Sequence, residues 1–332
     1  MNGWLTAGAR AMVFALLLAL GCAGGPEGSA RALPLASETA TTSPPPNLGP
    51  ITPRAGSGPL MVVGGGKIPD AVRARFIELA GGPEAQILIF PQASEREDAG
   101  SGHLKAWKES GANNVAIAEL IDPVRIARDL VRADAIWFGG GSQNRLMAAL
   151  EAAECVEALR RRHQQGCVFG GTSAGAAVMS QAMLTGDAHT DRLEPGTTVI
   201  GKGLGLWPGV IVDQHFLRRR RFLRLFAAVL DTPELVGVGI DEGTAVLVED
   251  GSWEVIGGSP VLVIDARGAE VWDAEVSDTE VSDAEVSDAE VSDAEVSDAE
   301  VSDAGVNEER APFRAEDVRL HALPPGVRWV AR

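Results

Sequence analysis

The chain has 332 residues, 45% of them hydrophobic, which is enough for one sizeable α/β domain or two small ones. Its formal charge of −17 arises mainly from residues 270–309, which contain nine Glu and seven Asp and no Lys or Arg. Removing these 16 acids from the total of 46 leaves 30 against 29 basic residues, so nothing in the remainder predicts a nucleic-acid partner.

The N-terminus is predicted to be a targeting segment. Arg10 precedes an apolar run over 11–20, the length of a signal-peptide core and too short to cross a bilayer. The run ends in Ala19-Leu-Gly-Cys22, which resembles a bacterial lipoprotein cleavage site. We therefore expect 1–22 to be a signal peptide, with lipidated Cys22 as the only link to a membrane. Ala19 stands where such sites usually have an aliphatic residue, so a plain secretory signal is the alternative. Both predict an exported protein, periplasmic or at the cell surface if anchored and secreted otherwise.

Residues 23–57 are rich in Gly, Ser, Thr, Ala and Pro. A segment of this composition buries too little apolar surface to order itself, so we predict a flexible tether. The remainder, 58–332, is predicted to be the folded domain.

Apolar runs alternate with helical patterns in the first half of this domain. The predicted strands cover 60–63, 85–90, 114–118, 135–138 and 167–169, and the predicted helices cover 71–80, 103–110, 124–133 and 146–163. Such alternation is typical of βαβ units and a parallel sheet. Glycine-rich loops follow Val63, Phe138 and Phe169, and the carboxyl ends of parallel strands form one edge. We expect a functional site there.

The second half adds further strands and one helix. The predicted strands cover 209–213, 236–240, 245–248, 253–256 and 260–265, with a helix over 217–230. The predicted fold class is therefore α/β, with a mostly parallel sheet flanked by helices and additional C-terminal strands.

A five-residue repeat, D-A-E-V-S, begins at Asp273 and continues to about Asp303. Neither a helix nor a strand gains an apolar face from this period, and the carboxylates repel one another. We predict a disordered acidic insertion over 273–308. Calcium binding is a weaker alternative, because the D-x-D spacing of calcium loops is absent.

Gly171-Thr-Ser-Ala-Gly175 matches G-x-S-x-G, which makes Ser173 a candidate nucleophile. A serine hydroxyl becomes nucleophilic when a base takes its proton and a third group orients that base. The other two groups must come from elsewhere in the chain.

Five histidines could supply the base. His163 follows three arginines and is expected at a solvated helix end, while His103 and His321 have no neighbouring signal. His189 follows the serine closely and has acids beside it. His215 comes directly after a predicted strand, which places it at the same edge as Ser173, so we favour it.

The orienting acid is predicted to be Asp241 or Glu242, which follow the strand over 236–240. An ordinary turn carboxylate is the alternative. Cys155 and Cys167 are either a disulfide pair or buried free thiols. No Cys or His spacing fits a metal site, and we expect no cofactor.

Four segments resemble the cyanophycinases and the wider group of serine peptidases that includes aspartyl dipeptidases. They are GGTSAGA at 170–176, DQHFLRRRRFLRL at 213–225, GIDEGTA at 239–245 and GGGSQ at 139–143. Ser142 departs from the family, which commonly has Asp there. The resemblance covers about 60–265 and excludes the tether and the repeat.

The resemblance implies a catalytic triad of Ser173, His215 and Glu242 in a fold similar to type 1 glutamine amidotransferases, which is flavodoxin-like. Those enzymes carry cysteine at the elbow, and α/β-hydrolases have their triad in another chain order. The oxyanion would be bound by backbone N–H groups of Ala174, Gly140 and Gly141. The residues implied to bind substrate are Gln143, Asp213, Gln214, Arg219, Arg221 and Arg224.

The predicted function is therefore that of an exported, cyanophycinase-like serine peptidase. It would hydrolyse multi-L-arginyl-poly-L-aspartate to β-Asp-Arg dipeptides through an acyl-enzyme on Ser173. One alternative is an exopeptidase for short aspartyl or isoaspartyl peptides, and another is a non-catalytic binding lipoprotein. Because related proteins often form dimers, the resemblance also allows a homodimer.

Overall fold

The computed structural model describes residues 51–96, 98–186, 193–273 and 313–330. The predictions for the signal segment, Cys22, His189 and all but the first residue of the repeat lie outside the described residues, and so does most of the tether. The described end of the predicted tether is packed: Ile51 is buried, and the Trp207 indole N–H donates to its carbonyl at 3.1 Å.

The larger of two main sheets has eight strands. From edge to edge they are β16 (Arg328–Val330), β11 (Ser252–Gly257), β10 (Thr244–Glu249), β1 (Leu60–Val63), β5 (Val168–Thr172), β4 (Ala135–Phe138), β2 (Gln86–Phe90) and β3 (Asn114–Ile117). The five strands from β1 to β3 are parallel, while β10, β11 and β16 pair antiparallel.

The second main sheet has six strands. Their order is β15 (Arg319–Leu323), β12 (Val261–Asp265), β9 (Val236–Ile240), β8 (Trp207–Gln214), β6 (Ser180–Leu184) and β7 (Ile200–Lys202). Only the β6–β8 and β8–β9 pairs are parallel. A small ribbon of β13 (Glu270–Asp273) and β14 (Phe313–Glu316) pairs antiparallel.

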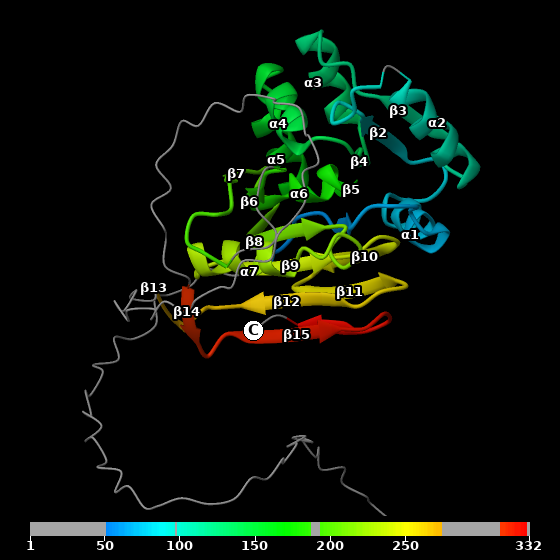
Figure 1. The fold of residues 1–332 in the computed structure, drawn as a ribbon. Coiled ribbons are helices and arrows are strands. Elements are labelled where there is room, and N and C mark those ends of the chain that lie inside the picture. Colours follow the sequence, from blue (N-terminus) through cyan, green and yellow to red (C-terminus); the bar gives the residue numbers. More distant parts are fainter. Residues whose placement is uncertain (1–50, 97, 187–192, 274–312, 331–332) are drawn as a thin grey trace, which may run out of the picture. The chain divides into compact units, whose positions relative to one another are not determined.

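Helices cover the outer faces of both sheets and part of the space between them (Figure 1). They are α1 (Asp70–Leu79), α2 (Ala99–Glu109), α3 (Pro123–Arg132), α4 (Gln143–Ala152), α5 (Val156–Gln164), α6 (Ala174–Ala177) and α7 (Phe222–Asp231). One core joins α1 and α2 to the larger sheet, a second joins α7 to the smaller sheet, and the largest lies between the sheets with α3 to α6. In the described part of the chain, no helix combines the length and apolar character that a membrane crossing requires.

The predicted α/β fold with helix-flanked strands is thus observed. The prediction of a single, mostly parallel sheet is wrong in part. The C-terminal strands form antiparallel pairs, and several strands belong to a separate sheet. The two-residue loop Asp250-Gly251, with φ of 47° and 75°, joins β10 to β11. A loop this short, with both residues at positive φ, connects antiparallel neighbours.

The predicted helix over 146–163 is two helices, α4 and α5. Glu154 between them has a φ of 51°, a left-handed conformation that cannot continue a right-handed helix. The strands β6, β7, β13, β14, β15 and β16 were not predicted, because they are short or their apolar pattern is weak. Asp273, the first residue of the predicted disordered insertion, lies in β13.

His163 is buried, contrary to the expectation of a solvated helix end. Only 3% of it is exposed, its Nε2 lies 2.8 Å from the Gly58 carbonyl oxygen, and its ring packs edge-on against Phe169. Burial lowers the pKa of His163 to about 4, although the hydrogen bond to Gly58 acts in the opposite direction. Of the three arginines that precede it, Arg161 is exposed, the other two are half-buried and donate to backbone carbonyls, and the His163 ring lies in the core. The one-dimensional pattern cannot separate these surroundings.

This burial predicts a loss of stability in mild acid. The unfolded chain takes up the His163 proton near pH 6.5, whereas the folded chain resists it until about pH 4. The free energy of unfolding should therefore fall by about 3 kcal/mol as the pH decreases across that window. Urea unfolding at pH 7 and pH 4.5 measures it. His163→Gln keeps a donor for Gly58 and does not titrate, so its loss should be clearly smaller; equal losses would contradict this assignment.

Candidate active site

Ser173 lies on a strained turn between β5 and α6. Its φ of 54° and ψ of −113° are unusual for a residue with a side chain. The flanking glycines allow the turn: a Cβ on Gly171 would lie 2.3 Å from the Gly175 carbonyl oxygen, and one on Gly175 would lie 2.3 Å from that of Phe138. The G-x-S-x-G spacing is therefore required by close backbone packing, and it presents the Ser173 hydroxyl at the end of the strand.

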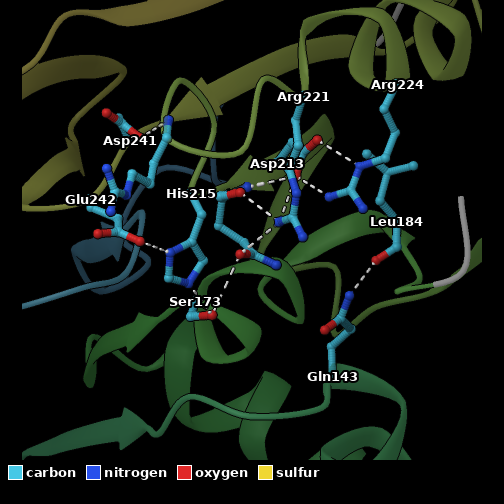
Figure 2. A network of polar contacts seen from close by, with 11 residues as sticks. Gln143, Ser173, Leu184, Asp213, His215, Arg221, Arg224, Asp241 and Glu242 are labelled. Carbon is cyan, nitrogen blue, oxygen red and sulfur yellow. Dashed lines mark hydrogen bonds and ion pairs between the residues drawn. The ribbon is translucent and has the colours of Figure 1, made fainter. Parts of the chain in front are cut away.

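His215 meets this hydroxyl from the other sheet. It follows β8, has a φ of 50°, and its backbone N–H donates to the Gly64 carbonyl at 2.6 Å. Its Nε2 lies 2.9 Å from Ser173 Oγ, as Figure 2 shows. The residue favoured from its place at a strand end is thus the one that contacts the serine.

Glu242 contacts the opposite side of the imidazole. Its Oε1 lies 2.5 Å from His215 Nδ1, whereas the neighbouring Asp241 accepts a hydrogen bond from the Arg218 backbone N–H at 2.9 Å. A carboxylate only accepts hydrogen bonds, so it favours the tautomer with the proton on Nδ1 and leaves Nε2 free to accept the serine proton. Of the two acids left open by the sequence, the structure brings Glu242 to the histidine.

The glycine run after β1 holds this pair in place, a role that the sequence did not reveal. A Cβ on Gly65 would lie 2.5 Å from His215 Nε2, and one on Gly66 would lie 2.9 Å from the Glu242 Cβ. Gly65 has a φ of 111°. The available signal was three consecutive glycines at a strand end, which indicates a close approach without saying what approaches.

Of the residues predicted to supply oxyanion N–H groups, Ala174 directly follows Ser173 and Gly140 lies beside it. A Cβ on Gly140 would lie 3.5 Å from the Ser173 Cβ, so this loop borders the nucleophile. Within the described residues, the N–H groups of Gly140, Gly141 and Ala174 have no acceptor. Gly141 lies against the next loop, where its Cβ would be 2.1 Å from the Ala93 carbonyl oxygen.

Asp213 and Arg224, implied to bind substrate, form an ion pair in the interior. Arg224 Nε donates to Asp213 Oδ2 at 3.0 Å, Arg224 Nη2 donates to Oδ1, and both side chains are at least 98% buried. Removing one partner of such a pair costs about 3–5 kcal/mol, because a buried charge is left alone. The pair therefore stabilises the end of β8, just before His215. Its burial does not support substrate contact for either residue.

Gln214 and Arg221 connect that ion pair to the serine, and Figure 2 shows Arg221 beside Asp213. Arg221 Nη1 donates to the Gln214 backbone carbonyl at 2.7 Å and to its side-chain Oε1 at 3.0 Å, and that Oε1 lies 3.4 Å from Ser173 Oγ. Burial lowers the pKa of Arg221 to about 10, while Asp213, 3.6 Å away, acts in the opposite direction. Gln214 thus lies at the nucleophile and Arg221 fixes its orientation.

The remaining predicted substrate residues lie in different surroundings. Gln143 is buried, and its Nε2 donates to the Leu184 carbonyl at 2.9 Å (Figure 2). Arg219 is exposed and makes no ion pair within the described part of the chain. Arg219 is therefore the signature arginine whose charge is open to a ligand.

The helix expected from Leu217 begins instead at Phe222, so Arg218, Arg221 and Arg224 do not share a helical face. A turn occupies the intervening residues, and Arg220 has a φ of 53°, which interrupts a right-handed helix.

Cys155 and Cys167 are buried as free thiols, the second of the two alternatives. Burial raises the pKa of Cys155 to about 11 and that of Cys167 to about 12. Thiols with such pKa values are poor nucleophiles at neutral pH. Neither thiol competes with Ser173 for a nucleophilic role.

The Ser173 hydroxyl is hydrogen-bonded to an imidazole, and that imidazole is hydrogen-bonded to a carboxylate. Such an arrangement, with the serine on a strained strand-to-helix turn, is typical of serine hydrolases on α/β folds. The chain belongs to peptidase family S51, whose model matches residues 60–256, and it is therefore a serine-type peptidase.

Individual relatives agree with this assignment. A cyanophycinase of Trichormus variabilis is 36% identical over 228 residues, covering 64% of this chain and 76% of the relative. Peptidase E of Pasteurella multocida is 25% identical over 185 residues, covering 53% of this chain and 77% of the relative. A crystal structure of a peptidase from an acI-B1 Actinobacterium shares the fold, with a TM-score of 0.50 and 24% identity over 63% of this chain and 91% of that one.

Proposed function

We propose that this peptidase hydrolyses cyanophycin, multi-L-arginyl-poly-L-aspartate, and releases β-Asp-Arg dipeptides. The observation that carries the proposal is the hydrogen-bonded chain Ser173–His215–Glu242 in a sequence 36% identical to a cyanophycinase. We also propose that the fold is of the glutamine amidotransferase-like type. Its five parallel strands, with the nucleophile directly after β5, support that assignment.

The proposed reaction begins with proton transfer from Ser173 Oγ to His215 Nε2, 2.9 Å away. The oxygen attacks the amide carbonyl carbon, and the carbonyl oxygen takes on negative charge. Glu242 stabilises the imidazolium through Nδ1. The imidazolium then gives its proton to the leaving amine, the C–N bond breaks, and an acyl-enzyme on Ser173 remains.

The N–H groups of Gly140 and Ala174 would bind the oxyanion, and each such donor contributes about 3 kcal/mol to transition-state stabilisation. Water, deprotonated by His215, then attacks the ester and frees Ser173. Gly141, the third predicted donor, lies in the same loop as Gly140 and stays a predicted oxyanion contact.

A second candidate function is hydrolysis of short aspartyl or isoaspartyl peptides, which similarity to a peptidase E favours. The third alternative, a non-catalytic binding lipoprotein, is inconsistent with membership of a peptidase family. Export, with or without lipidation of Cys22, remains part of the proposal and rests on the N-terminal sequence. A homodimer likewise remains a prediction.

Incubation with insoluble cyanophycin and with soluble β-Asp-Arg, α-Asp-X and isoaspartyl peptides tests the proposal. We expect soluble β-Asp-Arg to accumulate from the polymer, as measured by chromatography with mass detection. Turnover of the short peptides without release from the polymer would favour the second function. No release from any of these substrates would contradict both.

A further inference from the structure

Two helices carry aromatic side chains that pack on the larger sheet. Phe76 of α1 and Trp107 of α2 each pack against Trp137 of β4, with ring centroids 5.0 and 4.9 Å away. A Cβ on Gly170 of β5 would lie 2.6 Å from the Trp137 ring and 2.8 Å from that of Phe76. This defines an aromatic layer above β4 and β5.

The next layer toward the carboxyl edge is polar. The helices of βαβ units run antiparallel to the strands. A step of one turn toward a helix N-terminus therefore covers about the same distance, in the same direction, as a step of two residues toward a strand's carboxyl end. One such step from the aromatic layer leads to Arg73 on α1, His103 on α2, Thr172 at the end of β5 and Gly139 after β4.

Contacts place these groups together. A Cβ on Gly139 would lie 2.8 Å from His103 Nε2, and one on Gly140 would lie 3.9 Å from Thr172 Cγ2. Arg73 is near enough to His103 to lower the pKa of that imidazole, although burial contributes more to the shift. His103 and Thr172 therefore border the start of the Gly139–Gly141 loop. Arg73 lies one helical turn from the aromatic layer, on the side of His103.

Each of the three lacks a hydrogen-bond partner within the described residues. Arg73 Nε and Thr172 Oγ1 are buried and unpaired, Thr172 as a whole is 8% exposed, and His103 makes no hydrogen bond. Arg73 Nη1 has only a 3.7 Å contact with Asp70, whose side chain is 92% exposed. An unpaired buried polar atom costs about 1–3 kcal/mol, so a bound group is expected to satisfy these atoms.

The three residues adjoin the candidate reaction centre. Thr172 directly precedes Ser173, and Gly139 directly precedes Gly140, whose Cβ would lie 3.5 Å from that of Ser173. A group held there flanks the nucleophile on the side of α1 and α2.

We propose that Arg73, His103 and Thr172 form a subsite for a carboxylate of the peptide substrate. A guanidinium only donates hydrogen bonds, and a hydroxyl and an imidazole N–H can donate as well, so the three together match a group that only accepts. A carboxylate is such a group, and its charge complements Arg73. The inference rests on the proposed function, because it takes the ligand to be a peptide rich in free carboxylates. We call these three residues the carboxylate subsite.

Binding measured without turnover tests the subsite. In a Ser173→Ala background, calorimetry compares a dimer of β-Asp-Arg units carrying free carboxylates with its fully amidated counterpart. Arg73→Met should weaken binding of the free-carboxylate peptide about 10- to 100-fold, the range for a charge-assisted hydrogen bond, and leave the amidated peptide unchanged. Thr172→Val, which is nearly isosteric, should cause a smaller loss for the same peptide.

Arg75→Met is the matched control, because Arg75 lies on the same helix and pairs with Glu78 at 2.8 Å. It should change neither affinity, and melting temperatures check that every variant folds. Equal weakening of both peptides by Arg73→Met, or no change in either, would overturn the subsite and leave water as the partner of these groups. If the wild type fails to degrade cyanophycin but the Arg73-dependent difference persists, the proposed substrate fails and the subsite stands.

Discussion

Ser173→Ala should abolish peptide hydrolysis, with kcat falling by about 10⁶-fold. The substitution removes the hydroxyl oxygen that lies 2.9 Å from His215 Nε2, on a residue beside the Gly140 loop. Ala174 and Gly140 keep their N–H groups, so a residual rate above that in water is expected. Substrate binding should persist, because the hydroxyl contributes to the reaction far more than to the bound ground state.

Release of β-Asp-Arg from cyanophycin, followed with wild-type and variant protein at equal concentration, measures this loss. The melting temperature serves as the control and should stay within a few degrees, since the variant removes one oxygen from a half-buried residue. An active-site phosphonate should label the wild type at Ser173 and leave the variant unlabelled. Turnover within tenfold of the wild type would rule out Ser173 as the nucleophile.

Glu242→Gln should lower kcat by about 10⁴-fold, the effect known for an uncharged replacement of a triad acid. The amide can present its NH₂ group to His215 Nδ1, which favours the tautomer with the proton on Nε2. That tautomer cannot accept the serine proton, and the imidazolium also loses its counter-charge. KM should change much less than kcat, because Glu242 acts through His215 and not on the substrate.

Asp241→Asn provides a matched control one residue away. Asp241 accepts from the Arg218 backbone N–H, and asparagine can accept in the same place, so kcat should stay within about threefold. Steady-state kinetics of both variants on one peptide substrate make the comparison. Similar losses in the two would mean that the turn as a whole matters, and that Glu242 has no special role.

The three side chains of the candidate triad come from parts of the chain that are far apart in sequence. Ser173 follows β5 in the larger sheet, whereas His215 follows β8 in the smaller one, and Glu242 lies between β9 and β10. Each side chain comes from a strand end, where the backbone turns and a side chain can leave the sheet. The glycine run after β1 lies against both His215 and Glu242 and links the two sheets at the site.

Much of the candidate site could be predicted because its signals are local. A glycine spacing that allows a strained turn, a histidine directly after an apolar run and an acid after the next run are all visible within a few residues. Placement at the carboxyl ends of strands in one sheet is the reason to expect that they meet. They do lie together, but β5 and β8 belong to different sheets, so the packing of the two sheets brings His215 to Ser173. The α/β alternation up to β5 is equally local, because it depends on short apolar runs and helical periodicity.

Other features depend on contacts that no local pattern specifies. The arginine signature predicts ligand binding, yet Arg224 is paired with Asp213, eleven residues earlier, because the turn after β8 brings α7 back over that strand. His163 follows three arginines in the sequence and still lies in the core. Arg73, His103 and Thr172 come from three elements, and only the packing of α1 and α2 on the sheet brings them together.

The sequence by itself thus predicted a candidate nucleophile, a favoured base, two candidates for the acid and the α/β class, because turn chemistry and periodicity are properties of neighbouring residues. Only the tertiary structure decided between Asp241 and Glu242, divided the strands into two sheets, and separated arginines that pair inside the protein from those open to a ligand. Burial and pairing are set by which elements pack against one another, and that depends on the whole chain.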